Sequence, residues 1–314
     1  MITGFGSIES GVFPGLHGMR VLDKHRSTCV IFNSAALTIP TGAGWTALTF
    51  DSENFDNDNM HSTSTNTGRI TINHSGVYLL TAKVRWASNS TSYRDLHFFR
   101  NGTYLIASKM LWPNIAVAWP MTLGYLGRLN AGDYVETRGR IGSASGSVDI
   151  EAQTNLTPYV SATRLKDSYY CSVSNNAAIA IGDNARTALT FNTDNYDPND
   201  MHSTSSNTSR IVAPVPGWYV AFGQARWAAN TTGFREIRTA LNGPNPDYVE
   251  TGSGSYSTGP TTSIITQVQM LTTIYMSAND YLELIIGQNS GGNLNIQSSA
   301  DGLTPVFKLA RLSV

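Results

Sequence analysis

Two histidines lie in nearly identical polar segments of this 314-residue chain, in surroundings that would suit a metal site or a Ser/His pair. His61 lies in Met60-His-Ser-Thr-Ser, and His202 lies in the same five residues, which begin at Met201. A zinc site needs two or three further ligands, but each segment offers only Asn and Asp of the kind found in turns, and no second His. The residues therefore favour a loop whose Ser, Thr, Asn and His side chains bond to the backbone.

Acidic residues surround both histidines, and carboxylate oxygens are the ligands that Ca²⁺ prefers. Their spacing fails the EF-hand pattern, because Met60 falls where an Asp or Asn is needed and no Gly follows. We therefore predict a solvated acidic turn, and arginines on the open strand faces that pair with these carboxylates. The acidic residues are Asp51, Glu53, Asp56, Asp58, Asp194, Asp197 and Asp200; the arginines are Arg69, Arg85, Arg94, Arg210, Arg226 and Arg235.

The chain has two cysteines, Cys29 and Cys171, at corresponding places of a repeated sequence. A disulfide between them would require two equivalent first strands to come within about 7 Å of each other. No basic group is evidently placed to lower the pKa of either thiol, as a catalytic cysteine would need. The residues favour two reduced thiols that face the cores.

Acidic and basic side chains are almost equal in number, with 22 Asp and Glu against 21 Lys and Arg. Binding to nucleic acid needs a clustered excess of Lys and Arg, which the sequence lacks. No apolar stretch is long enough to cross a membrane, and the first residues lack the pattern of a secretory signal. We therefore expect no nucleic-acid partner, no membrane insertion and no cofactor.

The chain is a tandem repeat. Thr46-Ala-Leu-Thr-Phe50 recurs as Thr187-Ala-Leu-Thr-Phe191, and segment 60–70 recurs as 201–211 at the same spacing. Later in each copy, Ala131-Gly-Asp-Tyr134 matches Ala278-Asn-Asp-Tyr281. We therefore divide the chain into an N-terminal arm (1–28), a first domain (29–165) and a second domain (166–314).

Strand signals dominate both copies. Alternate residues of segment 76–86 are apolar, which predicts a strand with one buried face formed by Tyr78, Leu80, Ala82, Val84 and Trp86. Segment 94–105 has Asn-Gly at 101–102 between two apolar runs, which predicts a hairpin. We count roughly nine or ten strands per copy. The fold class is all-β: two tandem jelly-roll β-sandwiches.

The order of these motifs resembles the jelly roll of complement C-one-q and tumour-necrosis-factor-like proteins. The shared features are Thr-Ala-Leu-x-Phe, Gly-x-Tyr, a central Arg-Trp strand, Asn-Gly and Ala-x-Asp-Tyr. The chain is most similar to the version in virion proteins of tailed bacteriophages, through Met-His-Ser-Thr-Ser-x-Asn-Thr-x-Arg and Gln288-Asn-Ser-Gly-Gly292. The first copy departs from the last motif, with Arg140-Ile-Gly-Ser143 in its place.

This resemblance implies a homotrimer, because such jelly rolls pack about a threefold axis through one sheet. With two jelly rolls per chain, either two stacked trimers or a pseudo-sixfold ring would result. Other virion proteins are then partners, and the location is the virion, assembled in the host cytoplasm. The place on the particle, at the head, neck or tail, is left open.

Two segments outside the repeated core suggest contact sites. Segment 243–260 is rich in Tyr, Gly, Ser and Asn, which is the composition of adaptable recognition loops. We assign host-surface binding, to a glycan or a protein, to Asp247, Tyr248, Glu250 and Tyr256; a merely flexible loop is the alternative. The Gly-rich arm is assigned to particle attachment through Phe5, Phe13 and Leu16, with a dispensable tail as the alternative.

These observations predict a non-enzymatic virion structural protein, either a tail or head appendage or a decoration protein. A secreted trimeric binding module of the complement or cytokine class is the second interpretation. A carbohydrate-active enzyme would need two carboxylates about 5–9.5 Å apart in a cleft, and no pair can be assigned that role.

Overall fold

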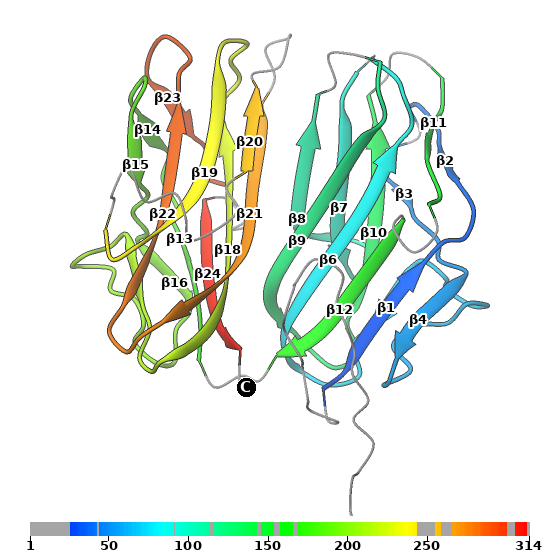
Figure 1. Cartoon of the computed structure of the whole chain (residues 1–314), viewed down its shortest axis with the longest axis horizontal. Coiled ribbons are helices and arrows are strands. Elements are labelled where there is room, and N and C mark those ends of the chain that lie inside the picture. Colours follow the sequence, from blue (N-terminus) through cyan, green and yellow to red (C-terminus); the bar gives the residue numbers. More distant parts are fainter. Residues whose placement is uncertain are drawn as a thin grey trace, which may run out of the picture.

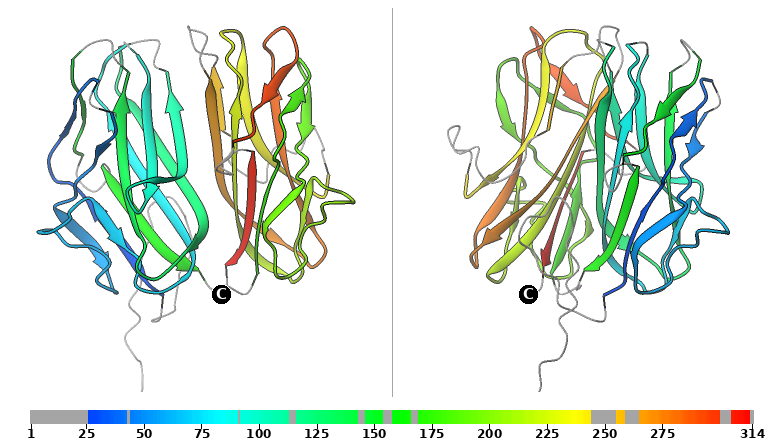
Figure 2. Two further views of the ribbon diagram at one scale, coloured as in Figure 1. Left: turned by 180° about the vertical axis from the view of Figure 1, so that it is seen from behind. Right: turned by 45° about the vertical axis from the view of Figure 1, so that its right-hand side comes forward.

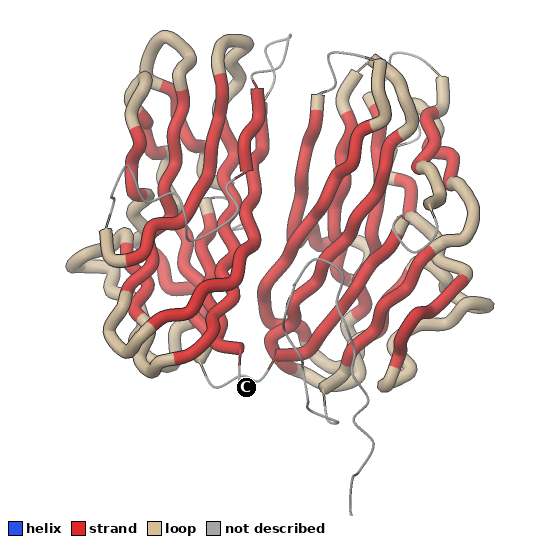
Figure 3. The backbone as a smooth tube through the Cα atoms, viewed as in Figure 1, coloured by secondary structure: helices blue, strands red, loops and turns tan. Residues whose placement is uncertain are grey.

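The structure is a computed structural model in which every regular element described is a β-strand (Figure 1, Figure 3). The described residues are 26–42, 44–90, 92–112, 116–142, 146–153, 158–165, 169–243, 255–258, 265–299 and 305–312; for 111 and 255–258 only the backbone is described. Within these ranges no helix is long and apolar enough to cross a membrane.

Strands β1 to β12 form one β-sandwich, called here the N-terminal sandwich. They are β1 (Thr28–Phe32), β2 (Leu37–Ile39), β3 (Thr46–Ala47), β4 (Ser52–Asp56), β5 (Arg69–Thr71), β6 (Gly76–Trp86), β7 (Arg94–Arg100), β8 (Tyr104–Leu111), β9 (Trp119–Leu129), β10 (Tyr134–Ile141), β11 (Val148–Ile150) and β12 (Tyr159–Leu165).

Strands β13 to β24 form a second β-sandwich, called here the C-terminal sandwich. They are β13 (Tyr170–Ser174), β14 (Ile179–Ile181), β15 (Arg186–Ala188), β16 (Thr193–Tyr196), β17 (Arg210–Val212), β18 (Gly217–Trp227), β19 (Phe234–Leu241), β20 (Ser255–Thr258), β21 (Thr266–Met276), β22 (Tyr281–Gln288), β23 (Leu294–Ile296) and β24 (Val306–Leu312). Each sandwich has more strands than the sequence predicts, because several are only two or three residues long.

Each sandwich pairs a seven-stranded sheet with a five-stranded sheet. In the first, the larger sheet has the order β2-β11-β6-β12-β1-β4 with β9 also on β6, and the smaller has β3-β10-β7-β8 with β5 on β10. The second repeats both orders strand for strand. The chain passes repeatedly from one sheet to the other, and its first long strand pairs with its last. This is the predicted jelly roll.

The buried face predicted for β6 is confirmed. Tyr78, Leu80, Ala82, Val84 and Trp86 lie in the core between the two sheets. Their counterparts in β18 are smaller, and the missing volume at Gly223 is filled by Leu284, one of whose methyl groups leaves no room for a side chain there. The predicted hairpin is also present as β7 and β8, with positive φ at Asn101 and Gly102 in the turn.

The two sandwiches lie side by side with their long strands running in similar directions (Figure 1, Figure 2). In addition to the core of each sandwich, a third apolar cluster lies between them. Its buried members are Val77, Leu126, Leu165, Tyr170, Val220, Phe222, Val306, Ala310 and Leu312. A single chain therefore already contains one interface between two jelly rolls.

Candidate functional site

Most of the site residues predicted from the sequence lie outside the described residues. Those are Phe5, Phe13, Leu16, Asp247, Tyr248 and Glu250. Tyr256 lies in β20, whose backbone pairs with β19 at Glu236, but its side chain is not described. The particle-attachment and host-binding assignments remain predictions.

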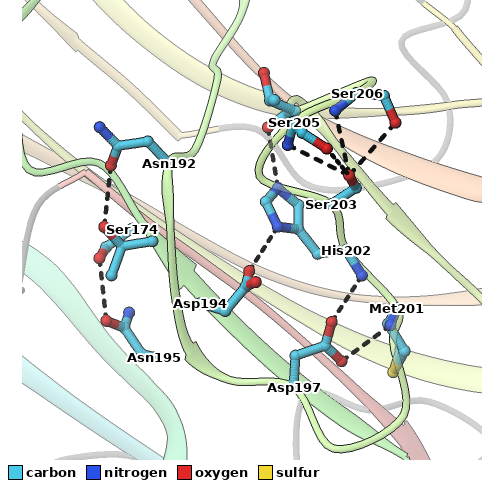
Figure 4. Close-up of polar contacts among 12 residues, drawn as sticks. Ser174, Asn192, Asp194, Asn195, Asp197, Met201, His202, Ser203, Ser205 and Ser206 are labelled. Carbon is cyan, nitrogen blue, oxygen red and sulfur yellow. Dashed lines mark hydrogen bonds and ion pairs between the residues drawn. The ribbon is translucent and has the colours of Figure 1, made fainter.

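The repeated histidine loop is held together by its own side chains (Figure 4). His202 Nδ1 lies 2.7 Å from a carboxylate oxygen of Asp194, and Nε2 lies 3.1 Å from the backbone oxygen of Thr208. The backbone amides of Met201 and His202 donate to the two carboxylate oxygens of Asp197 at 3.0 and 2.8 Å. The imidazole of His202 and the carboxylates of Asp194 and Asp197 are thus engaged with one another or with the backbone.

The same arrangement occurs in the first copy. His61 Nδ1 lies 2.9 Å from Glu53, His61 Nε2 lies 3.1 Å from the backbone oxygen of Thr67, and the His61 amide donates to Asp56 at 2.9 Å. The acidic residues predicted to form a solvated turn here are exposed or half-buried, and two of them, Glu53 and Asp56, also bind the imidazole and a loop amide. Among the described residues, no group of His, Cys, Asp and Glu is arranged to hold a metal ion.

The arginines are structural, but their partners differ from the predicted ones. Arg69 pairs with Glu136 at 3.0 Å and Arg210 with Glu283 at 3.4 Å, so the carboxylates belong to neighbouring strands and not to the acidic loop. Arg235 is fully buried and donates to backbone oxygens, including that of Phe234 at 2.8 Å. Arg94 is buried in the same way in the first copy.

Both cysteines are free and buried, as predicted. Burial is the main cause, and the negative charge of nearby carboxylates the second, that raises the pKa of both the Cys29 and the Cys171 thiols. A thiol held protonated in this way is a poor nucleophile, so the two cysteines serve as core residues.

The interface between the sandwiches joins two different surfaces. The N-terminal sandwich contributes the edge formed by β8 and β9, together with neighbouring apolar residues of the third cluster. The C-terminal sandwich contributes the outward face of its larger sheet, formed by β18, β21 and β24. Gly124 of β9 lies against Leu271 of β21, and a Cβ at Gly124 would be only 3.1 Å from a Leu271 methyl group. The bare backbone allows this close approach.

Two buried glutamines bind the edge strands of the opposite sandwich. Gln269 accepts a hydrogen bond from the Gly124 amide at 3.0 Å and donates to the Gly124 backbone oxygen at 3.2 Å. Gln224 accepts from the Ser108 amide at 3.3 Å and from Gln269 at 2.8 Å. These bonds satisfy backbone groups of β8 and β9 that no neighbouring strand occupies.

Lys308 of β24 points into the same interface. Its Nζ lies 4.5 Å from the ring centre of Tyr125 and 5.5 Å from that of Phe222. Burial lowers the pKa of Lys308 to about 7, and burial raises the pKa of Tyr125 to about 12. The ammonium group is thus held against aromatic rings at the cost of part of its hydration.

At one end of the interface, Arg128 of β9 lies on Tyr196 of β16. Its guanidinium donates to the tyrosine hydroxyl at 2.9 Å and lies 4.5 Å from the ring centre. Tyr196 also packs against Tyr170, with ring centres 5.6 Å apart. Arg128 of the N-terminal sandwich thus packs on the Tyr170 and Tyr196 pair of the C-terminal sandwich.

Large apolar side chains remain exposed elsewhere. Trp218 and Tyr275 lie side by side on the outward face of β18 and β21, 45% and 52% exposed, with ring centres 5.8 Å apart. Phe55 of β4 is 44% exposed. Strand β4 forms the edge of the larger sheet of the N-terminal sandwich that lies opposite β9. These exposed apolar surfaces were not predicted from the sequence. One signal for them is the replacement of Val77 of the first copy by Trp218 in the second.

Comparison with known proteins gives likenesses of fold alone. No family model and no curated protein matches the sequence. The globular domain of zebrafish complement 1qA protein is similar in structure over 46% of this chain and 98% of its own, with 18% identity and a TM-score of 0.33. Eiger TNF from S. frugiperda is similar over 46% of this chain and 94% of its own, with 15% identity and a TM-score of 0.34.

Proposed function

We propose that this chain is a non-enzymatic, homotrimeric structural protein of a tailed-bacteriophage virion, with a second role in contact with the host surface. The observation that carries self-association is the exposed pair Trp218 and Tyr275. Their counterparts in the first copy, Val77 and Arg128, are engaged by the other sandwich. The aromatic pair is therefore exposed at positions whose equivalents in the first copy form an interface. Such a pair indicates a protein partner.

The virion assignment rests on a resemblance of sequence motifs to those of phage virion proteins, above all Met-His-Ser-Thr-Ser, which occurs in both copies. In this proposal the arm 1–28 attaches the chain to the particle, and the loop that includes Tyr248 meets a host glycan or protein. The alternative, a secreted trimeric binding module, uses the same fold and the same self-association. The two differ in where the chain is found.

Immunogold labelling tests the virion role. Antibodies raised against the purified chain should label particles of a phage that encodes it, at a fixed position on the head, neck or tail. Labelling should disappear from particles assembled with a chain that lacks residues 1–25, a deletion that leaves the buried Arg26, Ser27 and Thr28 in the sandwich. The chain recovered in particle-free medium, with no label on any virion, would favour the secreted module.

A loop deletion tests the host-binding role. Residues 255–258 form β20 and complete the smaller sheet, so the deletion should replace only 244–254 with a short Gly-Ser linker. We expect assembly to be unchanged and adhesion of labelled protein to host cells to fall. Adhesion equal to that of the intact chain would remove this loop from the account.

A further inference from the structure

The contact between the two sandwiches is heterologous, which means that its two sides are different surfaces. In an isologous contact both partners use the same surface. If residue i of the first sandwich contacted residue j of the second, the residue equivalent to j in the first would also contact the residue equivalent to i in the second. Arg128 of the N-terminal sandwich lies on Tyr196 of the C-terminal sandwich. The exchanged interaction would join Tyr275 to Phe55, but both of these side chains are exposed. The interface therefore uses only one of the two equivalent pairs of surfaces.

Strand register establishes which residues are equivalent. Arg128 of β9 is paired with Val77, the second residue of β6. Tyr275 of β21 is paired in the same way with Trp218, the second residue of β18, so Arg128 and Tyr275 are equivalent. Phe55 is paired with Val30 across β4 and β1. Tyr196 is paired with Ser172 across β16 and β13. Arg128 and Tyr196, which meet across the contact, thus each have an exposed equivalent on the other sandwich. Leu79 and Leu165, the equivalents of Val220 and Leu312, are themselves part of the contact.

The two unoccupied surfaces match each other chemically. The first presents the two rings of Trp218 and Tyr275. The second presents Phe55 beside Val30 and the hydroxyl pair of Thr81 and Ser161, whose oxygens lie 2.6 Å apart. Ser161 takes the place of Lys308 on this second surface, and Lys83 takes the place of Gln224, so its lysine lies on β6, two residues from Thr81.

We propose that a second copy of this chain binds here, with Trp218 and Tyr275 of one copy packed on Phe55 of the next. Tyr275 then meets Phe55 between chains at the positions where Arg128 meets Tyr196 within one chain. This contact rests on the proposed self-association and adds the residues that carry it. Because the contact is heterologous, successive copies join head to tail and must close into a ring to give a finite assembly.

Cross-linking tests the contact directly. The variant with Phe55→Cys and Tyr275→Cys, treated with a short bismaleimide, should give covalent multiples of the chain in a denaturing gel. Cys29 and Cys171 are buried and should not react. Phe55→Cys alone and Tyr275→Cys alone should remain single chains, as should the pair Tyr104→Cys with Tyr275→Cys. Links formed by either single variant, or none in the double variant, would overturn the proposal.

Charge substitutions give a second, independent test by sedimentation velocity. Phe55→Glu and Tyr275→Lys should each raise the dissociation concentration by about tenfold or more, and their combination in one chain should recover most of the loss. Tyr104→Glu is the matched control, because Tyr104 is 60% exposed outside the contact. Circular dichroism should show that all four variants fold.

The unmodified chain separates the two proposals. If it sediments as a single chain at every concentration, self-association itself is wrong and this contact falls with it. If it assembles, and Phe55→Glu and Tyr275→Lys assemble equally well, the proposed self-association stands and this contact is overturned.

Discussion

Lys308 and Ser161 occupy equivalent positions in the two larger sheets, yet only the lysine lies under the other sandwich. Its ammonium group faces the rings of Tyr125 and Phe222. Aromatic faces attract a cation but do not replace its hydration fully. The interface within the chain therefore carries a group whose charge state affects its stability.

Substitution of Lys308 should change how stability depends on pH. The unfolded chain still binds a proton at Lys308 between pH 7 and the ordinary lysine pKa of 10.5, where the folded chain has released it. The free energy of unfolding should therefore rise with pH through this window. Lys308→Met should remove that rise and stabilise the protein at pH 6 by about 1 kcal/mol.

Urea unfolding of Lys308→Met and wild type at pH 6, 8 and 9.5 checks this expectation. Lys83→Met is the control, because Lys83 lies on the outward face of β6 at the place equivalent to Gln224. A pH dependence that Lys308→Met leaves unchanged would show that the lysine stays hydrated.

His202 should contribute to stability and not to chemistry. Its two ring nitrogens bind Asp194 and the backbone oxygen of Thr208, and its side chain is fully buried. His202→Ala removes the ring that joins Asp194 to the backbone oxygen of Thr208, and should lower the free energy of unfolding by about 1–3 kcal/mol. Ser205→Ala, in the exposed part of the same loop, should change it by less than about 0.5 kcal/mol. Thermal unfolding followed by circular dichroism measures both, and equal effects would contradict the role given to His202.

At the level of single strands, β18 differs from β6 in having both faces buried. Val220, Phe222 and Gln224 lie under the N-terminal sandwich, whereas Thr81, Lys83 and Arg85 of β6 are only half-buried. Alternation of apolar and polar residues predicts one buried face, and a continuous apolar run predicts two. The run Trp218-Tyr-Val-Ala-Phe222 was therefore a signal for a covered sheet, which the repeat itself obscured.

Gln269 should couple β21 to the edge of the N-terminal sandwich. Gln269→Leu leaves the amide and the backbone oxygen of Gly124 without their partner in a buried place. We expect a loss of about 1–3 kcal/mol in the free energy of unfolding. Gln267→Leu, two residues earlier on the same face but less buried, is the control. A loss of the same size in both variants would show that the glutamine does not join the sandwiches.

The sequence predicted the strands well and their packing partners poorly. The alternation of apolar and polar residues and the Asn-Gly turn are signals that lie within a few residues of one another in the sequence. Strands β6, β7 and β8 could therefore be predicted. The contact of Arg128 with Tyr196, or of Gly124 with Leu271, depends on how two separately folded units dock. A single sequence contains no local pattern for such a contact, and the exposure of the Phe55 ring was accordingly not predicted.

At the level of the whole molecule, the sandwiches should be separable without loss of either fold. Each has its own core, and the third cluster between them contains the buried ring of Phe222. Phe222→Glu places a charge in that cluster and should remove most of the coupling, while both cores stay intact.

Differential scanning calorimetry distinguishes the outcomes. Phe222→Glu should unfold in two resolved transitions, one for each sandwich, and Tyr104→Glu should behave like wild type. A single transition in Phe222→Glu at the wild-type temperature would mean that the sandwiches do not stabilise each other through this cluster. Loss of all native structure would mean that they cannot fold apart.

The arrangement of the sandwiches also bears on how copies assemble. The sequence left open whether two jelly rolls per chain stack or lie in one ring. In the structure they lie side by side, and one sandwich covers the face of the other (Figure 2). Trp218 lies on the same face of β18 as Val220 and Phe222, next to the covered area, and Phe55 lies on the edge strand β4 of the other sandwich.

The mass of the purified chain in solution, measured by light scattering with and without residues 1–25, tests self-association through the sandwiches most directly. The deletion stops at 25 because Arg26, Ser27 and Thr28 are buried in the N-terminal sandwich. We predict three times the 34.0 kDa of one chain for the full protein, and a trimer again after the deletion. A single-chain mass for both proteins across the accessible concentration range would contradict the account. A trimer that depends on residues 1–25 would contradict the placing of the contacts in the sandwiches.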